Sequence, residues 1–235
     1  MNRMKKFFAL LLLLLFLAPA ALGEAQLSFP TGEQFSIAAE WVGQQYRGAD
    51  YAREKIFRLD IIREETKEIF QSLYVSTQDD FEGMPGIVAK DLDFDGYPDL
   101  DILYLLGASN SQHTFFFYNP NESAFEARNI GAIWLSNYTL YPEKQLVYNY
   151  IHDSAATGAS EIYRWEDGQL RLVRRAEICF DEKSPMTLIL SVREPDEDWG
   201  GTRETHLRSL DLNQAAAGAE LVLHQEMEKL LWQGL

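Results

Sequence analysis

Between Asp91 and Asp101 the chain reads Asp-Leu-Asp-Phe-Asp-Gly-Tyr-Pro-Asp-Leu-Asp, a spacing of carboxylates that suits calcium. Asp91, Asp93 and Asp95 occupy positions 1, 3 and 5 of a loop that wraps hard oxygen ligands around Ca²⁺. Gly96, at position 6, permits the sharp turn that such a loop needs. The segment therefore predicts a calcium site.

Two more oxygen ligands follow in the same loop. Tyr97 would offer its carbonyl oxygen at position 7, and Asp99 a carboxylate at position 9. The alternative interpretation, an acidic β-turn, does not account for so many carboxylates, which repel one another without a cation. Asp101 either accepts a hydrogen bond beside the ligands without contacting the ion, or is a solvated residue. The predicted ligands are Asp91, Asp93, Asp95, Tyr97 and Asp99.

The flanks of the loop distinguish it from an EF-hand. An EF-hand requires a bidentate Glu at position 12, where this chain has Ile102. Residues 86–90 and 100–106 are rich in β-forming side chains, so we expect strands on both sides. A ligand loop between strands holds a sheet together, and calcium would be structural here.

Further strand patterns surround this loop. Asp167-Gly168 between two alternating apolar runs is a strong hairpin signal. We expect strands over residues 55–62, 68–75, 86–90, 100–106, 113–118, 124–127, 145–151, 160–165, 169–173 and 187–192.

Helices are expected only near the two ends. Apolar residues at partly helical spacing predict a short helix within Thr31–Arg47, and the tail 217–232 predicts a closing helix. Residues 193–205 are polar and charged and predict an exposed loop. The predicted fold is all-β, built of antiparallel hairpins in a sandwich-like or propeller-like array, with a short N-terminal helix and a C-terminal helix.

The N-terminus has the pattern of a secretory signal peptide. Arg3, Lys5 and Lys6 precede an apolar run over residues 7–17. Small residues then allow cleavage after residue 20, 23 or 25. We expect an extracytoplasmic protein, periplasmic or secreted, without a membrane span in the mature chain. The predicted divisions are a signal peptide at 1–25, a calcium-loop β domain at 26–180 and a C-terminal extension at 181–235.

The net charge limits the class of binding partner, and the cysteine content limits the kind of cross-link. The formal net charge is −15, which argues against nucleic acid and permits a cationic protein partner. Cys179 is the single cysteine, so an intrachain disulfide is excluded, and calcium could serve as the cross-link instead.

The order of three motifs resembles a known family. The calcium loop is followed by Phe-Phe-Tyr-Asn-Pro-Asn at 116–121 and by Ile-Tyr-Arg-Trp-Glu-Asp-Gly-Gln-Leu at 162–170. Over roughly residues 55–173 the chain resembles exported bacterial β-proteins with a single FG-GAP- or VCBS-like calcium loop, typified by a periplasmic lysozyme-inhibitor immunity protein. The resemblance implies the same five calcium ligands, no catalytic activity, and a cationic lysozyme-like enzyme as partner. The chain departs from the typified member in lacking a lipoprotein cysteine and in its C-terminal extension.

Catalytic patterns are weak in this sequence. His152-Asp153-Ser154 has poor geometry for a triad, because adjacent residues on an extended chain point to opposite faces. The four histidines show no metal-ligand spacing: His113, His152, His206 and His224. We therefore expect a non-enzyme, an exported calcium-stabilised binding protein that inhibits a peptidoglycan-cleaving enzyme. The alternatives are a cell-wall or carbohydrate-active hydrolase that uses acidic residues, and a structural surface module.

Overall fold

The described part of the chain is almost entirely β-structure. The computed structural model describes residues 25–47, 52–78, 83–106, 109–128, 130, 133–196, 201–216 and 218–235. These residues form fourteen strands, one 3₁₀-helix and one α-helix, and the chain divides into two compact units between Ala89 and Lys90. The all-β class and the C-terminal helix are thus confirmed, whereas the predicted signal peptide lies almost wholly outside the described residues.

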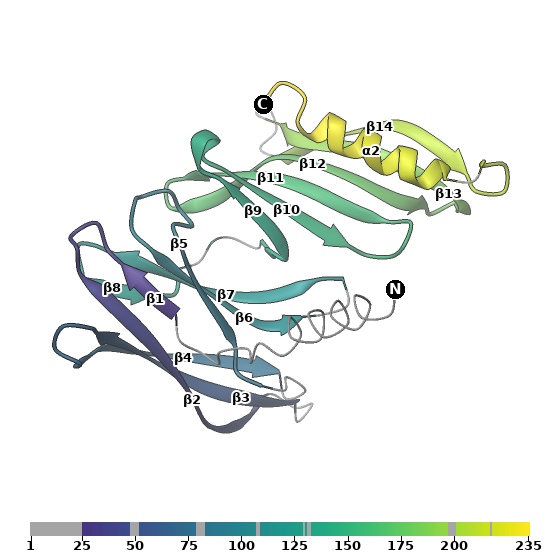
Figure 1. The fold of residues 1–235 in the computed structure, drawn as a ribbon. Helices are drawn as coiled ribbons and strands as arrows, with labels where there is room; N and C mark the ends of the chain where they lie inside the picture. The colour runs from purple at the N-terminus through teal and green to yellow at the C-terminus, as the bar shows by residue number, and fades with distance from the viewer. Residues whose placement is uncertain are drawn as a thin grey trace, which may run out of the picture. The chain divides into compact units, whose positions relative to one another are not determined.

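The first unit holds a four-stranded antiparallel meander. Its sheet has the order β1-β2-β3-β4, and the short strand β5 follows in sequence (Figure 1). The apolar residues alternate with polar ones, so one face of the sheet is buried. The bounds are β1 (Ala25–Ser28), β2 (Gln34–Arg47), β3 (Ala52–Arg63), β4 (Ile69–Gln78) and β5 (Gly86–Lys90).

The short N-terminal helix predicted within Thr31–Arg47 is wrong, because strand β2 occupies this segment. Phe35 and Ile37 alternate onto the buried face and are almost fully buried. Trp41 and Val42, which suggested a helical apolar face, are instead exposed, next to a register shift in the β2–β3 pairing. A β-bulge there breaks the period-two pattern and makes it look partly helical.

The second unit contains two groups of strands and a helix. Strands β6, β7 and β8 are neighbours in one sheet, and a separate six-stranded sheet has the order β14-β13-β12-β11-β10-β9. The bounds are β6 (Asp99–Leu106), β7 (Ser111–Asn119), β8 (Ala124–Glu126), β9 (Asn137–Tyr141), η1 (Pro142–Lys144), β10 (Leu146–His152), β11 (Gly158–Glu166), β12 (Gln169–Asp181), β13 (Ser184–Asp196), β14 (Gly201–Asp211) and α2 (Ala219–Leu231).

The six-stranded sheet is covered on both faces. Neighbouring residues Leu146 and Val147 of β10 point to opposite faces and are both buried. Leu146 belongs to the apolar cluster under α2, which contributes Leu223, Met227 and Leu231. Val147 belongs to a second cluster on the opposite face, to which β7 adds Phe115. Figure 1 shows α2 lying along this sheet. Within this unit, the six-stranded sheet therefore lies between α2 on one face and β7 on the other.

The hairpin at Asp167-Gly168 forms as predicted. Both residues have positive φ, 51° and 72°, as a type I′ turn requires. It joins β11 to β12 in the six-stranded sheet. All ten predicted strand segments fall on observed strands.

Two predictions for the C-terminal part do not match the structure. Much of the predicted loop at residues 193–205 lies in β13 and β14. Because β14 is an edge strand whose residues 201–209 are all exposed, its sequence carries no apolar alternation. The expected division after residue 180 falls within the six-stranded sheet, where β12 pairs with β13, so residues 181–235 are not a separate extension.

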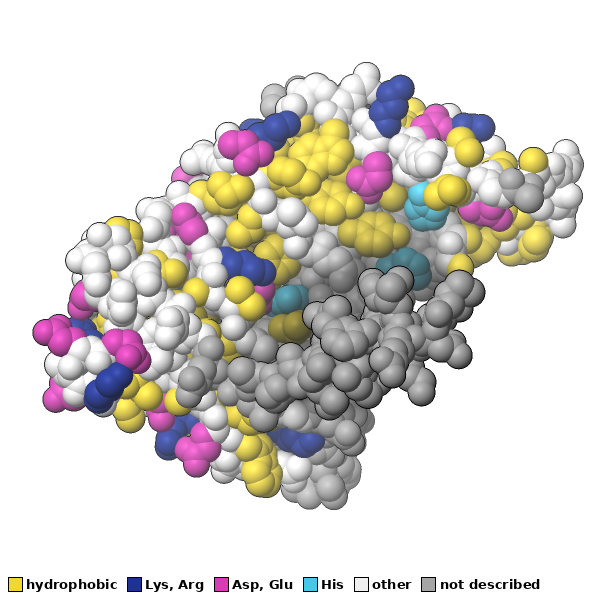
Figure 2. Space-filling model, viewed as in Figure 1, with side chains coloured by type: hydrophobic (Ala, Val, Ile, Leu, Met, Phe, Trp, Pro, Cys, Tyr) yellow, Lys and Arg dark blue, Asp and Glu magenta, His cyan; other side chains and the backbone are white. Residues whose placement is uncertain are grey.

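The surface of this part mixes several kinds of side chain. In Figure 2, hydrophobic side chains gather over the region of the six-stranded sheet and α2, with acidic and histidine side chains beside them. Among the described residues, no helix has both the length and the apolar character needed to cross a membrane.

Candidate metal centre

The acidic loop preceding β6 folds around the Asp91 side chain. Its two carboxylate oxygens accept hydrogen bonds from the backbone N–H groups of Asp95 and Gly96, each at 3.0 Å. Phe94 and Gly96 have positive φ of 62° and 90°, and the glycine takes that conformation without steric cost. The first aspartate of the motif therefore fixes the curvature of the loop.

Asp99 anchors the other end of the loop. It is fully buried, and its carboxylate accepts the backbone N–H groups of Leu92 and Tyr118, both at 2.8 Å. Burial, together with the nearby charges of Asp93 and Asp95, raises the pKa of Asp99 to about 7 despite these hydrogen bonds. An ionised Asp99 at neutral pH would be stabilised by a bound cation.

Three carboxylates converge at the centre of this loop. One oxygen each from Asp91, Asp93 and Asp99 lie within 4.8 Å of one another. The Asp93 side chain is only 10% exposed, and its Oδ1 is buried without a hydrogen-bond partner among the described residues. A buried carboxylate oxygen without a partner is costly, and a cation would satisfy it. The donor set, all hard oxygens, suits calcium.

The other two predicted ligands are an exposed carboxylate, that of Asp95, and a backbone carbonyl, that of Tyr97. Asp95 is exposed, and its Oδ1 accepts the backbone N–H of Tyr97 at 2.8 Å. It is not one of the three carboxylates that converge. Tyr97 is half-buried, and its ring packs against that of Tyr118 at 5.4 Å between centroids. The structure thus brings together Asp91, Asp93 and Asp99 of the predicted set.

Arg128 approaches the site from outside the loop. Its Nη1 donates to Asp93 Oδ2 at 2.5 Å, and its guanidinium lies 4.6 Å from the centroid of the Phe117 ring. One Asp93 oxygen is therefore neutralised by the protein itself, and the other is left for a cation. Sequence reasoning missed Arg128, because no local pattern links residues so far apart.

Behind the loop, Asp101 forms a buried ion network. Lys90 Nζ and the Tyr138 hydroxyl both donate to Asp101 Oδ2, at 2.9 and 2.5 Å, and His113 Nδ1 lies 2.5 Å from Oδ1. Burial opposes ionisation of Asp101, but the hydrogen bonds from His113, Tyr138 and Lys90 outweigh it and lower its pKa. Asp101 is 2% exposed, so it is not the solvated residue that was one of the two expectations for it.

Ser111, His113 and Asp101 form a row that looks like a hydrolytic triad. His113 Nε2 lies 2.8 Å from Ser111 Oγ. The Ser111 hydroxyl, however, donates to the carbonyl oxygen of Ser136 at 2.6 Å, so the imidazole must donate to the serine oxygen. Ser111 is also 7% exposed. The arrangement fits a structural network better than a poised nucleophile. Its only sequence signal is that Ser111 and His113 share one face of β7.

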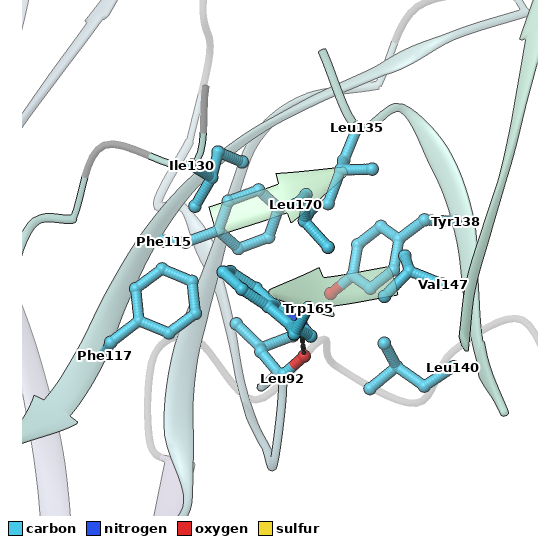
Figure 3. A pocket seen from close by; sticks show the side chains of 10 residues that line it. All are labelled: Leu92, Phe115, Phe117, Ile130, Leu135, Tyr138, Leu140, Val147, Trp165 and Leu170. Atoms are coloured by element: carbon cyan, nitrogen blue, oxygen red, sulfur yellow. Dashed lines mark hydrogen bonds between the residues drawn. The ribbon is translucent and has the colours of Figure 1, made fainter. Parts of the chain in front are cut away.

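A packed group of apolar side chains connects the loop to the six-stranded sheet. Trp165 Nε1 donates to the carbonyl oxygen of Leu92 at 2.7 Å, and Figure 3 shows this contact within a ring of apolar side chains. The cavity among them is about 10 Å³, so it holds no ligand larger than a water molecule. It is a packed core and not a binding pocket. The lining residues are Leu92, Phe115, Phe117, Ile130, Leu135, Tyr138, Leu140, Val147, Trp165 and Leu170.

Comparisons with known proteins give no family for this chain. No family model matches the sequence, and no curated protein matches it. A solved structure described as "Structure of a Xanthomonas Type IV Secretion System related protein" superposes with a TM-score of 0.45 at 11% identity, covering 79% of this chain and 94% of that one. A likeness of that degree carries no argument about function.

Proposed function

We propose that this chain is an exported, calcium-stabilised binding protein without catalytic activity. The observation that carries the calcium part is the buried Asp93 Oδ1, which has no partner among the described residues and lies beside the carboxylates of Asp91 and Asp99. Export is supported by the signal-peptide pattern at the N-terminus.

Calcium suits this site better than the smaller magnesium ion. Magnesium demands near-ideal octahedral geometry and keeps several waters, whereas calcium tolerates irregular carboxylate and carbonyl ligands. Asp91 and Asp99 are each held here by two backbone hydrogen bonds, so they are not free to rearrange into the octahedron that magnesium demands. We expect a dissociation constant of about 10⁻⁴ to 10⁻³ M, as in extracellular modules.

The test of the calcium site is a comparison of metal-free and calcium-loaded protein. Calcium at several millimolar should raise the melting temperature of protein purified with a chelator, and isothermal titration should give one site per chain. Magnesium at the same concentration serves as the control. Identical melting with and without calcium would refute the calcium site.

The proposed partner is a cationic enzyme that cleaves peptidoglycan, which this protein would inhibit. Two observations support it, the net charge of −15 and the resemblance of residues 55–173 to the immunity-protein family. Immobilised protein should retain a cationic lysozyme-type enzyme at physiological salt and slow its cleavage of cell walls. Retention of the enzyme only at low ionic strength would indicate nonspecific charge attraction and would refute the inhibitor role.

A hydrolase is the second candidate, because Ser111, His113 and Asp101 lie in a hydrogen-bonded row, although the Ser111 hydroxyl must turn away from the Ser136 carbonyl before it can act as a nucleophile. Turnover of an ester, peptide or cell-wall substrate by purified protein, abolished in Ser111→Ala, would establish it. If neither hydrolysis nor inhibition is found while calcium still binds, the remaining role is that of a structural surface module.

A further inference from the structure

A groove lies between strand β10 and helix α2, on the surface of the second unit. Tyr148 and Tyr150 line it from one face of β10, because residues two apart on a strand point the same way. His224, Met227 and Glu228 line it from α2. Its volume is about 430 Å³, enough for one long side chain or a small molecule. Figure 2 shows hydrophobic, acidic and histidine side chains together in this region.

Glu228 is held in one position within this groove. Its Oε1 accepts hydrogen bonds from the Ser160 hydroxyl at 2.5 Å and the Tyr148 hydroxyl at 3.0 Å. Ser160 is fully buried, so this anchor is part of the sheet. Both hydroxyls use the same carboxylate oxygen, and among the described residues no Lys or Arg lies within ion-pair distance of Glu228. The carboxylate is therefore fixed and lacks a counter-charge.

The electrostatic surroundings of the groove are negative. Burial raises the pKa of the Tyr148 and Tyr150 hydroxyls, and the charge of Glu228 raises them further, so both rings stay neutral. The charge of Asp153 acts on Tyr150 in the same direction. On the helix, the nearby Glu226 is already paired with Arg208 at 2.5 Å. Unlike Glu226, Glu228 is thus not neutralised by an ion pair among the described residues.

We propose that this groove binds a lysine or arginine side chain of a partner protein. Tyrosine rings attract organic cations through their electron-rich faces, and a fixed carboxylate supplies the opposite charge. The two half-buried tyrosine rings also offer apolar surface for the methylene stem of such a side chain. The inference rests on the proposed function only in naming a protein as the source of the cation. The groove is separate from the acidic loop.

The test uses short capped tripeptides with lysine, arginine or norleucine between two glycines. Their binding is followed by chemical shifts of the Tyr148 and Tyr150 ring protons in calcium-loaded protein, with tyrosine-to-phenylalanine variants for assignment. The lysine and arginine peptides should shift these signals in a saturable way, and the norleucine peptide should not. Equal binding of the norleucine peptide would overturn the proposal.

Two variants in the groove and one matched control locate the binding. Glu228→Gln keeps an amide oxygen for Ser160 and Tyr148 but removes the charge, and should weaken cation binding about tenfold. His224→Lys places a cation in the groove without touching the buried hydrogen bonds and should abolish binding. Glu226→Gln removes the same charge two residues away and should leave affinity unchanged. Equal losses in Glu228→Gln and Glu226→Gln would show a net-charge effect and refute the site.

Failure of this inference is distinguishable from failure of the proposed function. Calcium binding measured on the same samples reports on the acidic loop alone. If the enzyme is inhibited equally by wild type and by His224→Lys, the groove is not used and this inference falls while the proposed function stands. If N-acetylglucosamine oligomers shift the tyrosine signals and the basic peptides do not, the groove binds sugar and the inference is wrong.

Discussion

The indole N–H of Trp165 donates a 2.7 Å hydrogen bond to the carbonyl oxygen of Leu92, which follows the first aspartate of the acidic loop. Trp165 lies on β11, so this contact ties the loop to the six-stranded sheet. The Trp165 ring also packs edge-on against Phe117 of β7, at 5.4 Å between centroids. The position of the loop therefore depends on a residue far from it in sequence.

Replacing Trp165 should weaken both the fold and the calcium site. Leu92 is 3% exposed, so Trp165→Phe leaves a buried carbonyl oxygen unsatisfied, which costs about 1–3 kcal/mol. We expect the free energy of unfolding in urea to fall by that amount, and calcium affinity to fall with it. Trp134→Phe is the control, because Trp134 is 49% exposed and should change stability by less than about 0.5 kcal/mol. A larger effect of the control would contradict this reading.

The aspartates of the loop should differ in their importance for calcium. Asp93 has the buried oxygen without a partner, whereas Asp95 is exposed and lies outside the converging trio. Asp93→Asn should therefore weaken calcium binding by at least about tenfold, and Asp95→Asn by less, as measured by isothermal titration. If Asp95→Asn causes the larger loss, the ion is held in the arrangement that the sequence predicts with all five ligands.

The sequence predicts local features of this protein well. The alternation of apolar residues marks the strands of both units, and Asp167-Gly168 marks a type I′ hairpin, because each depends on neighbours along the chain. The same holds for the spacing of the loop aspartates, since they follow one another closely along the chain. These features need no knowledge of tertiary structure.

Features that depend on distant residues escape prediction. Arg128 reaches Asp93, and His113 reaches Asp101, only after the sheets assemble. Strand β14 forms through main-chain pairing with β13 and has no apolar face to reveal it. The bulge near Trp41 shifts the register of β2, so the spacing of apolar residues there resembles that of a helix. In each case the deciding interaction lies outside the local pattern.

Removing Arg128 should tighten calcium binding while it destabilises the metal-free protein. Its guanidinium neutralises Asp93 without metal but repels a calcium ion that binds beside it. Arg128→Met keeps apolar volume over the Phe117 ring. We expect a several-fold gain in calcium affinity and a lower melting temperature in chelator. Arg171→Met, at an exposed position of β12, is the control and should alter neither quantity. Weaker calcium binding in Arg128→Met would mean that the arginine positions Asp93 and does not compete with the ion.

The metal-free protein should lose stability as pH rises from about 4 to about 7. The pKa of Asp99 is about 7 in the folded chain against an ordinary value of 3.8, so between these values the folded state holds a proton that the unfolded state has lost. The free energy of unfolding then falls with increasing pH. Saturating calcium binds the ionised carboxylates and should flatten this fall near pH 7. Urea titrations at pH 4.5, 6 and 7.5 in metal-free buffer and in calcium measure both trends, and a steady rise in metal-free stability over this range would contradict the assignment to Asp99.

Breaking the ion network around Asp101 should lower the stability of the folded protein. Asp101→Asn leaves the Lys90 ammonium without its carboxylate and removes the charged acceptor of the His113 and Tyr138 hydrogen bonds, and a lost hydrogen bond to a charged group costs about 1.5–3 kcal/mol. We expect the urea midpoint to fall accordingly, with the metal-free and the calcium-loaded protein affected equally, because Asp101 is not one of the three converging carboxylates. Asp167→Asn is the matched control, since the exposed hairpin turn accepts asparagine at positive φ and should keep its stability. A loss confined to the calcium-loaded form would instead make Asp101 part of the metal site.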